Sequence, residues 1–247
     1  MHVESHGGVG LRRLLLVLAL ALLVAVAVAA APAVAAPAST TLTVTAQSTS
    51  VDWGSTAVLN GILQTTDAPT LPVDQQQVLV QYAAYPIGPW TTADTVTNQA
   101  APYTSGEYTY PWTAARNYYW RMDFLGTTEW AAAVGNYEYV KVRPVLGKPS
   151  RPSSIKHGKK FTVSGSLKPK YPAGSKNVQV KAQKYSGGKW KAYKTYTATT
   201  ADSGSYSKYS VKLSISKKGK YRFYATTANT STLAAGKSAY SRSMKIK

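Results

Sequence analysis

The sequence predicts an all-β protein made of two tandem antiparallel β-sandwiches that follow an export signal. Three observations predict this: an apolar N-terminal segment, an internal repeat at a spacing of about a hundred residues, and apolar side chains that alternate with period two. The expected organisation is a signal peptide over residues 1–36, a first unit over residues 37–144 and a second unit over residues 145–247.

The N-terminus has the order of features that is typical of a secretory signal peptide. Arg12 and Arg13 precede an apolar run over residues 14–31, and small residues follow it up to Ala36. Cleavage after Ala36 fits this pattern best, cleavage after Ala31 is a second option, and the run is also long enough to remain as an anchor across a bilayer of ~30 Å. In each case we expect the rest of the chain outside the cytoplasm, secreted or non-covalently associated with the cell surface. No later segment is apolar for long enough to predict a transmembrane span.

A shift of about a hundred residues brings the two units into register. Residues 51–61 match residues 155–165. Gly54 and Gly61 of the first segment correspond to Gly158 and Gly165 of the second. Further pairs follow in the same order: Trp90 with Trp190, residues 105–108 with 203–206, and residues 119–121 with 221–223. The order of these pairs indicates a tandem duplication that has diverged.

Within each unit the period of two predicts half-buried strands. Val178, Val180 and Ala182 alternate with polar residues, and glycine-containing turns separate such runs at short intervals. We expect seven strands in each unit and no helix after the signal. Because the chain has no cysteine, each unit must be stabilised by its hydrophobic core alone.

The second unit resembles the bacterial immunoglobulin-like (Ig-like) domains that occur in tandem in secreted actinobacterial proteins. The resemblance rests on four segments, residues 158–165, 187–190, 202–206 and 219–225, and it covers nearly all of residues 150–247. The first unit matches more loosely. The resemblance implies two tandem immunoglobulin-like antiparallel β-sandwich domains and no shared chemistry. Both units lack the paired cysteines of antibody domains, whereas Gly219–Tyr221 is typical of the turn before a tyrosine corner.

The residue types needed for an active site are scarce. After the signal the chain has one histidine, His157, and the second unit has one carboxylate, Asp202. Acid–base and nucleophilic sites need a matched pair of such groups, and the acids of the first unit are scattered one per segment. We therefore expect no enzyme, no catalytic residue, no cofactor and no metal site.

Charge distinguishes the two units most sharply. Residues 37–144 contain four Lys and Arg against eight Asp and Glu, whereas residues 145–247 contain twenty-three against one. This excess predicts long-range attraction to polyanions, and an anionic cell-envelope polymer is the expected partner. Twenty of these cations are lysines, which favours diffuse attraction over sequence-specific recognition of nucleic acid. The candidate polyanion-binding residues are Lys159, Lys160, Lys181, Lys189, Lys191, Lys212, Lys220 and Arg222.

Aromatic residues are the other candidates, because the first unit is rich in them. Alternation predicts that Tyr82, Tyr108 and one of Tyr119 or Trp120 belong to the core. Trp112 and Trp130 lie in segments that read as loops, where exposed rings can stack on a ligand such as carbohydrate.

Three functions remain open at this stage. The leading hypothesis is a secreted, monomeric, non-enzymatic binding or structural protein that the second unit holds at the cell envelope. The alternatives are an extracellular binder of polyanions or nucleic acid that acts away from its own cell, and a ligand or inhibitor module that uses the aromatic loops of the first unit.

Overall fold

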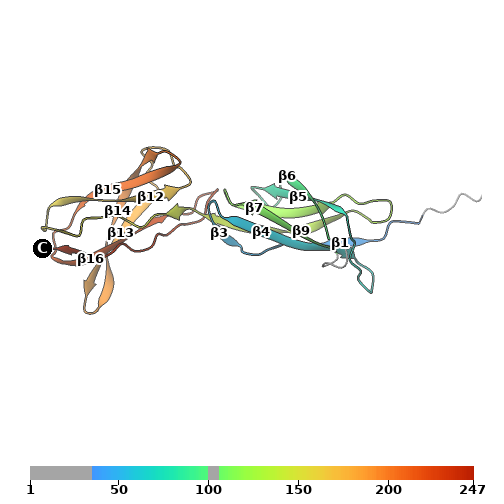
Figure 1. The fold of residues 1–247 in the computed structure, drawn as a ribbon, viewed down its shortest axis with the longest axis horizontal. Coiled ribbons are helices and arrows are strands. Elements are labelled where there is room, and N and C mark those ends of the chain that lie inside the picture. The colour runs from blue at the N-terminus through green and yellow to red at the C-terminus, as the bar shows by residue number, and fades with distance from the viewer. Residues whose placement is uncertain (1–34, 100–105) are drawn as a thin grey trace, which may run out of the picture. The chain divides into compact units, whose positions relative to one another are not determined.

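The protein is all-β in a computed structural model that describes residues 35–99 and 106–247 (Figure 1). The predicted signal peptide lies outside the described residues, apart from Ala35 and Ala36. Among the described residues no helix is long and apolar enough to cross a membrane.

Residues 40–143 form the first sandwich, which has two sheets. Its strands are β1 (Thr40–Leu42), β2 (Thr45–Ala46), β3 (Ser50–Asp52), β4 (Thr56–Thr65), β5 (Gln77–Ala83), β6 (Thr91–Thr97), β7 (Glu107–Thr113), β8 (Tyr118–Phe124) and β9 (Ala133–Arg143). One sheet consists of β4 with β1 and β2 on one side and β7 on the other, and the second has the order β3-β9-β8-β5-β6.

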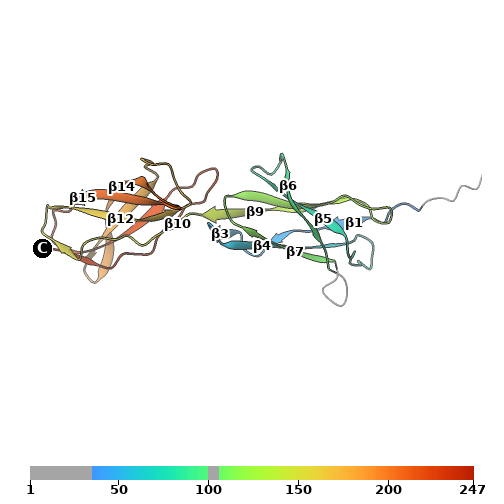
Figure 2. The ribbon, with the colours of Figure 1, turned by 45° about the horizontal axis from the view of Figure 1, so that its top comes forward.

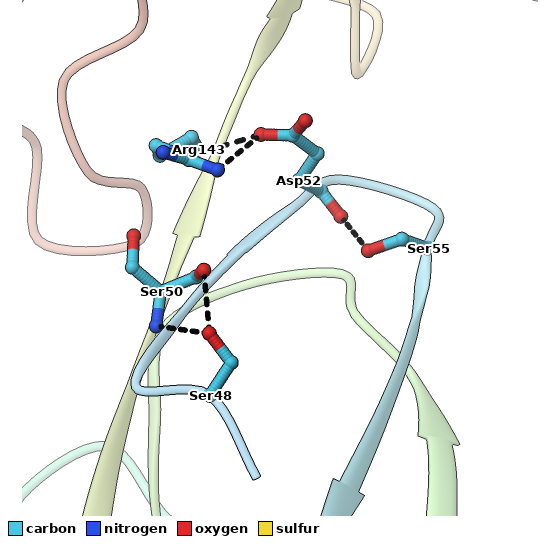
Figure 3. A network of polar contacts seen from close by, with 5 residues as sticks. All are labelled: Ser48, Ser50, Asp52, Ser55 and Arg143. Carbon is cyan, nitrogen blue, oxygen red and sulfur yellow. Dashed lines mark hydrogen bonds and ion pairs between the residues drawn. The ribbon is translucent and has the colours of Figure 1, made fainter.

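The first strand of this sandwich is broken into three short pieces that pair with different sheets. β1 and β2 pair antiparallel with β4, but β3 pairs parallel with β9, so that Asp52 lies opposite Arg143. The Arg143 guanidinium donates a hydrogen bond and forms an ion pair with the Asp52 carboxylate at 3.0 Å (Figure 3). Ser55 donates to the Asp52 carbonyl oxygen at 2.6 Å, which closes the turn into β4.

Residues 145–246 form the second sandwich. Its strands are β10 (Val145–Leu146), β11 (Ser154–Ile155), β12 (Lys160–Lys168), β13 (Val178–Ser186), β14 (Lys189–Ser203), β15 (Tyr206–Ser214), β16 (Gly219–Thr227) and β17 (Met244–Ile246). The start of β14 pairs with β13, and its last five residues pair with β15, so this strand passes from one sheet to the other. The hairpin of β13 and β14 projects beyond the neighbouring strands in both views of the ribbon (Figures 1 and 2).

Each sandwich buries one side of its strands, as the alternation predicts. Val178, Val180 and Ala182 of β13 are at most 2% exposed. They pack with residues of the opposite sheet, including Leu213 and Phe161, in one hydrophobic cluster. In the first sandwich Tyr108 and Trp120 are buried and Tyr82 packs against them at partial burial, so the predicted core aromatics are confirmed.

The strand order is that of an Ig-like sandwich. When β1, β2 and β3 are counted as one broken first strand, and β10 and β11 as another, each sandwich has seven strands, as predicted. The predicted tyrosine corner is present, because the Tyr221 hydroxyl donates to the Lys217 carbonyl oxygen at 2.9 Å, four residues upstream.

Two parts of the predicted alignment between the units are wrong. The match of residues 119–121 with 221–223 is shifted by one residue, because Arg121 lies opposite Gln81 as Arg222 lies opposite Gln183. Residues 105–108 were matched with 203–206, which pairs Tyr108 with Tyr206. The strand pairing instead places Tyr108 opposite Gly61 and Tyr209 opposite Gly165. The turn glycines Gly106 and Gly204 do align. The buried tyrosine is the second residue of β7 but the fourth residue of β15, so Tyr209 is the structural counterpart of Tyr108.

Candidate functional site

The outward side of the β13–β16 pair carries the densest arrangement of cations and aromatic rings in the second sandwich. Gln183 lies opposite Arg222, and Lys181 lies opposite Tyr224. The segment after β16 runs along the same edge, where the backbone of Lys237 forms an isolated antiparallel β-bridge with Thr226. We call this surface the basic aromatic face; it consists of Lys176, Lys181, Gln183, Tyr185, Trp190, Lys220, Arg222, Tyr224, Lys237 and Tyr240.

Arg222 lies at the centre of this face and is held on three sides. Its Nε donates to Gln183 Oε1 at 2.7 Å. Its Cζ lies 3.9 Å from the ring centroid of Tyr240 and 4.6 Å from that of Trp190. A planar guanidinium stacks well on aromatic rings, so these contacts fix its orientation.

The lysines of the face also lie over aromatic rings. Lys237 Nζ is 5.1 Å from the Tyr224 ring centroid and 5.5 Å from that of Tyr240. Lys220 Nζ is 5.9 Å from the centroid of Tyr185, a ring that is 43% exposed. The rings support the stems of the lysines while the charged groups remain at the surface.

A hollow of about 530 Å³ lies at one end of the face. Three lysines line it, Lys176, Lys181 and Lys237, together with the polar side chains of Gln179 and Thr226. Three ammonium groups around one hollow favour an anionic group inside it.

No acid of the second sandwich compensates the charge of this face. Asp202 is the single acid of residues 145–247. It lies in the part of β14 that pairs with β15, and it forms an ion pair with Lys170. The hydrogen bond from Lys170 lowers the pKa of the Asp202 carboxyl, so this acid stays ionised beside its own partner. The basic aromatic face therefore presents uncompensated positive charge.

The structure brings together three of the eight predicted polyanion-binding residues, namely Lys181, Lys220 and Arg222. Lys212 and Lys160 lie on β15 and β12, in the other sheet, and Lys159 lies in the turn before β12. The two sheets share one core, so their outward sides face opposite directions.

Lys189 and Lys191 lie near the face but point away from it. Lys191 lies on β14 opposite Lys184, one position after Trp190. Because side chains alternate along a strand, Lys189 and Lys191 project from the other side of the hairpin than Trp190 does. The eight predicted residues therefore do not form one surface: they divide among two sheets and two sides of a hairpin.

Sequence reasoning missed several members of the face, and the available signal differs among them. Gln183 and Tyr185 continue the outward alternation of Lys181, and Tyr224 continues that of Arg222, so counting alternate positions could have found them. Lys237 and Tyr240 belong to an irregular segment before β17, where no period marks the outward side.

Of the two predicted ligand-stacking residues, Trp130 lies in the connection between β8 and β9, as predicted, whereas Trp112 does not lie in a loop. Trp112 is part of β7, is 8% exposed and packs against Trp120 with ring centroids 4.6 Å apart. Trp130 forms an isolated bridge with Ala38 and packs at partial burial against the first core. The loop assignment of Trp112 is wrong because its alternation with Tyr108 and Tyr110 continues past Pro111 to the end of the strand.

The first sandwich shows which part of the face is shared scaffold. There Arg121 Nε donates to Gln81 Oε1 at 2.8 Å, and its Cζ lies 4.4 Å from the centroid of Trp90. This arrangement repeats that of Gln183, Arg222 and Trp190. The surroundings differ between the two sandwiches. Leu79 stands where the second sandwich has Lys181, Tyr119 stands where it has Lys220, and Asp123 stands where it has Tyr224. The arginine triad is thus common to both sandwiches, and the lysines are specific to the second.

Comparison with known proteins adds no family. No protein-family model matches the sequence, and no curated protein is similar to it. One solved structure with partial likeness is an ICAM-5 D1–D4 ectodomain fragment, with a TM-score of 0.41, 12% identity and coverage of 83% of this chain and 53% of that chain. A second is red sea bream transglutaminase, with a TM-score of 0.37, 12% identity and coverage of 83% of this chain and 31% of that chain. A third is trypsin-activated alpha-2-macroglobulin from Escherichia coli, with a TM-score of 0.29, 14% identity and coverage of 86% of this chain and 16% of that chain. The chain therefore spans about half, or less, of the length of these structures.

Proposed function

We propose that the protein is a secreted, non-enzymatic binding protein that the basic aromatic face of its second domain, residues 145–247, holds at the cell envelope by contact with an anionic polymer. The observation that carries this proposal is the gathering of five cations, Lys176, Lys181, Lys220, Arg222 and Lys237, on one face without an acid. The first domain, residues 37–144, then acts as a spacer or a recognition module.

The chemistry of the face suits a flexible phosphate polymer. Lysine ammonium groups attract phosphate as point charges and tolerate a range of geometries. Arg222 already uses its guanidinium plane on Trp190 and Tyr240, so it contributes charge and shape rather than a free bidentate fork. A repeating phosphate backbone needs no more than several adjacent positive sites, which the lysine-lined hollow and Lys220 supply.

A non-enzymatic role agrees with the distribution of reactive groups. Among the described residues no three side chains of His, Cys, Asp or Glu come together as a metal site. His157 lies in an exposed turn, and its backbone N–H donates to the Lys247 carbonyl oxygen. The basic aromatic face itself contains no carboxylate and no histidine that could move a proton.

The experiment is binding of the full secreted chain to immobilised poly(glycerol phosphate) over a series of salt concentrations. Electrostatic attachment predicts strong binding at low salt and a steep loss as salt rises, because counterions screen the lysines and the phosphates. Absence of binding at low salt, or binding that is indifferent to salt, would overturn the proposal.

The alternative is an extracellular binder of nucleic acid, and the same lysines would serve it. Single-stranded nucleic acid gains affinity by stacking its bases on free aromatic faces. Each ring of the face already has a cation over it: Arg222 lies over Trp190 and Tyr240, Lys220 over Tyr185, and Lys237 over Tyr224. These cations leave fewer free ring faces on which bases could stack. We therefore expect poly(glycerol phosphate) to compete at least as well as single-stranded DNA of equal phosphate content at matched salt. Clear preference for DNA would favour the alternative.

A further inference from the structure

The first sandwich contains an aromatic cleft that the basic aromatic face does not involve. The cleft has a volume of about 560 Å³, which lies within the ~300–1,000 Å³ typical of small-molecule sites. The residues that line it are Thr56, Tyr82, Tyr110, Pro111, Trp112, Thr113, Ala115, Tyr118 and Trp120. None of them is charged.

Trp120 is the centre of the ring cluster that forms the cleft. Its ring centroid lies 4.6 Å from that of Trp112, 5.6 Å from that of Tyr82, and 6.0 Å from those of Tyr110 and Tyr118. The two tryptophans are buried, whereas the three tyrosines are half-buried and reach the surface. The cleft thus combines aromatic walls with phenolic hydroxyls.

The second sandwich shows why this place is open in the first. There β14 passes from one sheet to the other, and its Tyr193 packs edge-on against Tyr221 at 5.2 Å. Tyr196 stands opposite Val180 and packs against the same core. The bulge that follows Ala182 in the second sandwich follows Val80 in the first, so Ala93 and Val96 occupy the positions of Tyr193 and Tyr196. Among the described strands β7 pairs only with β4. The duplicated unit therefore has one copy in which tyrosines cover the core at this edge and one copy in which they do not.

Two polar groups in the cleft lack partners. The indole N–H groups of Trp112 and Trp120 are both buried, and neither has a hydrogen-bond acceptor in the described part of the chain. A buried donor without an acceptor is unfavourable, but neither N–H group is accessible to water, so a ligand oxygen can reach one only if the ring shifts toward the cleft. Asp94 lies close enough to Tyr110 to raise the pKa of the Tyr110 hydroxyl, after the larger effect of burial, which puts a carboxylate acceptor beside the cleft.

From this geometry we infer that the first sandwich binds a neutral carbohydrate in the aromatic cleft. A pyranose ring presents an apolar face of C–H groups that stacks on tyrosine and tryptophan, and an edge of hydroxyls that donate and accept hydrogen bonds. The lining residues are uncharged, and one cation and one anion lie beside them, namely Arg116, whose Cζ lies 5.4 Å from the Tyr118 ring centroid, and Asp94. The cleft therefore offers no excess of positive charge that would favour an anionic sugar. The phenolic hydroxyls and Asp94 match the hydroxyls of a sugar. This site is independent of the basic aromatic face, which lies on the second sandwich.

The test is titration of the full secreted chain with three neutral hexasaccharides, namely cellohexaose, N-acetylchitohexaose and mannohexaose. Binding is measured by calorimetry and by the change in tryptophan emission that a ligand beside Trp112 and Trp120 should cause. We expect saturable binding of at least one of the three at micromolar to millimolar concentrations. Failure of all three to bind would overturn the inference.

Two variants locate the binding. Ala115→Phe places a ring at the exposed rim of the cleft, and Ala93→Tyr introduces the residue that, as Tyr193, covers the same edge in the second sandwich. Both should weaken binding at least tenfold. Ala132→Phe makes the same change as Ala115→Phe at an exposed position outside the cleft and should bind as the parent chain does. Urea unfolding checks that all three variants remain folded, and an unchanged affinity of folded Ala115→Phe would contradict the inference.

Discussion

The ring of Tyr209 occupies the space that a side chain at position 165 would need. Tyr209 on β15 lies opposite Gly165 on β12, and its hydroxyl donates to the Gly147 carbonyl oxygen at 2.8 Å. A Cβ built on Gly165 would collide with the Tyr209 hydroxyl and ring. The glycine thus allows a buried tyrosine to reach across two strands and tie them together.

Gly165→Ala should therefore destabilise the second sandwich although the backbone conformation at residue 165 tolerates alanine. Overpacking of a rigid contact costs about 1–3 kcal/mol, and we expect a loss of unfolding free energy in this range. Urea denaturation of the purified chain measures it. Thr162→Ala, at an exposed position of the same strand, serves as the control and should change stability by less than about 0.5 kcal/mol. Equal effects of the two substitutions would contradict the steric account.

Stability should also decline at alkaline pH because of buried tyrosines. Burial, and after it the hydroxyls of Tyr193 and Tyr196, raise the pKa of Tyr221 from 10.0 to about 12. The unfolded chain loses this proton near pH ~10 while the folded chain retains it, so the contribution is complete below about pH 10 and is lost as the pH rises toward about 12. Urea midpoints across this range should fall. Tyr221→Phe lacks the titrating hydroxyl, so its midpoint should fall less steeply, and a parallel fall would refute the assignment.

Arg222 should be sensitive to replacement by lysine even though the charge is kept. Lys at this position loses the hydrogen bond to Gln183 and the stacking on Trp190 and Tyr240, which together are worth about 1–2 kcal/mol. Urea denaturation of Arg222→Lys should show this loss. Arg242→Lys, at an exposed position, provides the matched comparison, and a loss of the same size there would show that the stacking contributes nothing.

The Asp52–Arg143 ion pair should contribute little to the free energy of unfolding, in contrast to the buried contacts of Tyr209 and Tyr221. The two side chains are 58% and 47% exposed, so water and salt screen their attraction. Arg143→Gln should lower the unfolding free energy by less than about 1 kcal/mol. A larger loss in thermal or urea unfolding would show that the pair holds β3 against β9 more firmly than a surface ion pair can.

The fold followed from the sequence because its determinants are local and repeated. Period-two alternation identified the inward side of β13 through Val178 and Val180, and the turn before Tyr221 identified the tyrosine corner. The alignment failed at Tyr209 because strand pairing, not the distance from the preceding turn, decides which tyrosine lies opposite Gly165.

The candidate site was less predictable because it depends on which side of a strand or hairpin a residue occupies. Lys212 and Lys220 both occupy outward positions of alternating strands, but they lie in different sheets of one sandwich. The aromatic cleft was missed because its openness depends on the crossing of β14 in one unit and on Ala93 and Val96 of β6, which replace two tyrosines, in the other. No single residue type in the sequence marks that difference.

The most direct test of the proposed envelope attachment compares two fourfold Lys→Gln variants of equal net charge in binding to immobilised poly(glycerol phosphate). One carries changes at Lys176, Lys181, Lys220 and Lys237 of the basic aromatic face, which leaves Arg222 in place. The other carries changes at Lys160, Lys168, Lys208 and Lys212, all exposed on β12 and β15. The account predicts that the first variant binds at least tenfold more weakly than the second at the same salt concentration, a difference of about 1.4 kcal/mol. Equal losses in the two variants would contradict it, because net charge alone would then explain the binding.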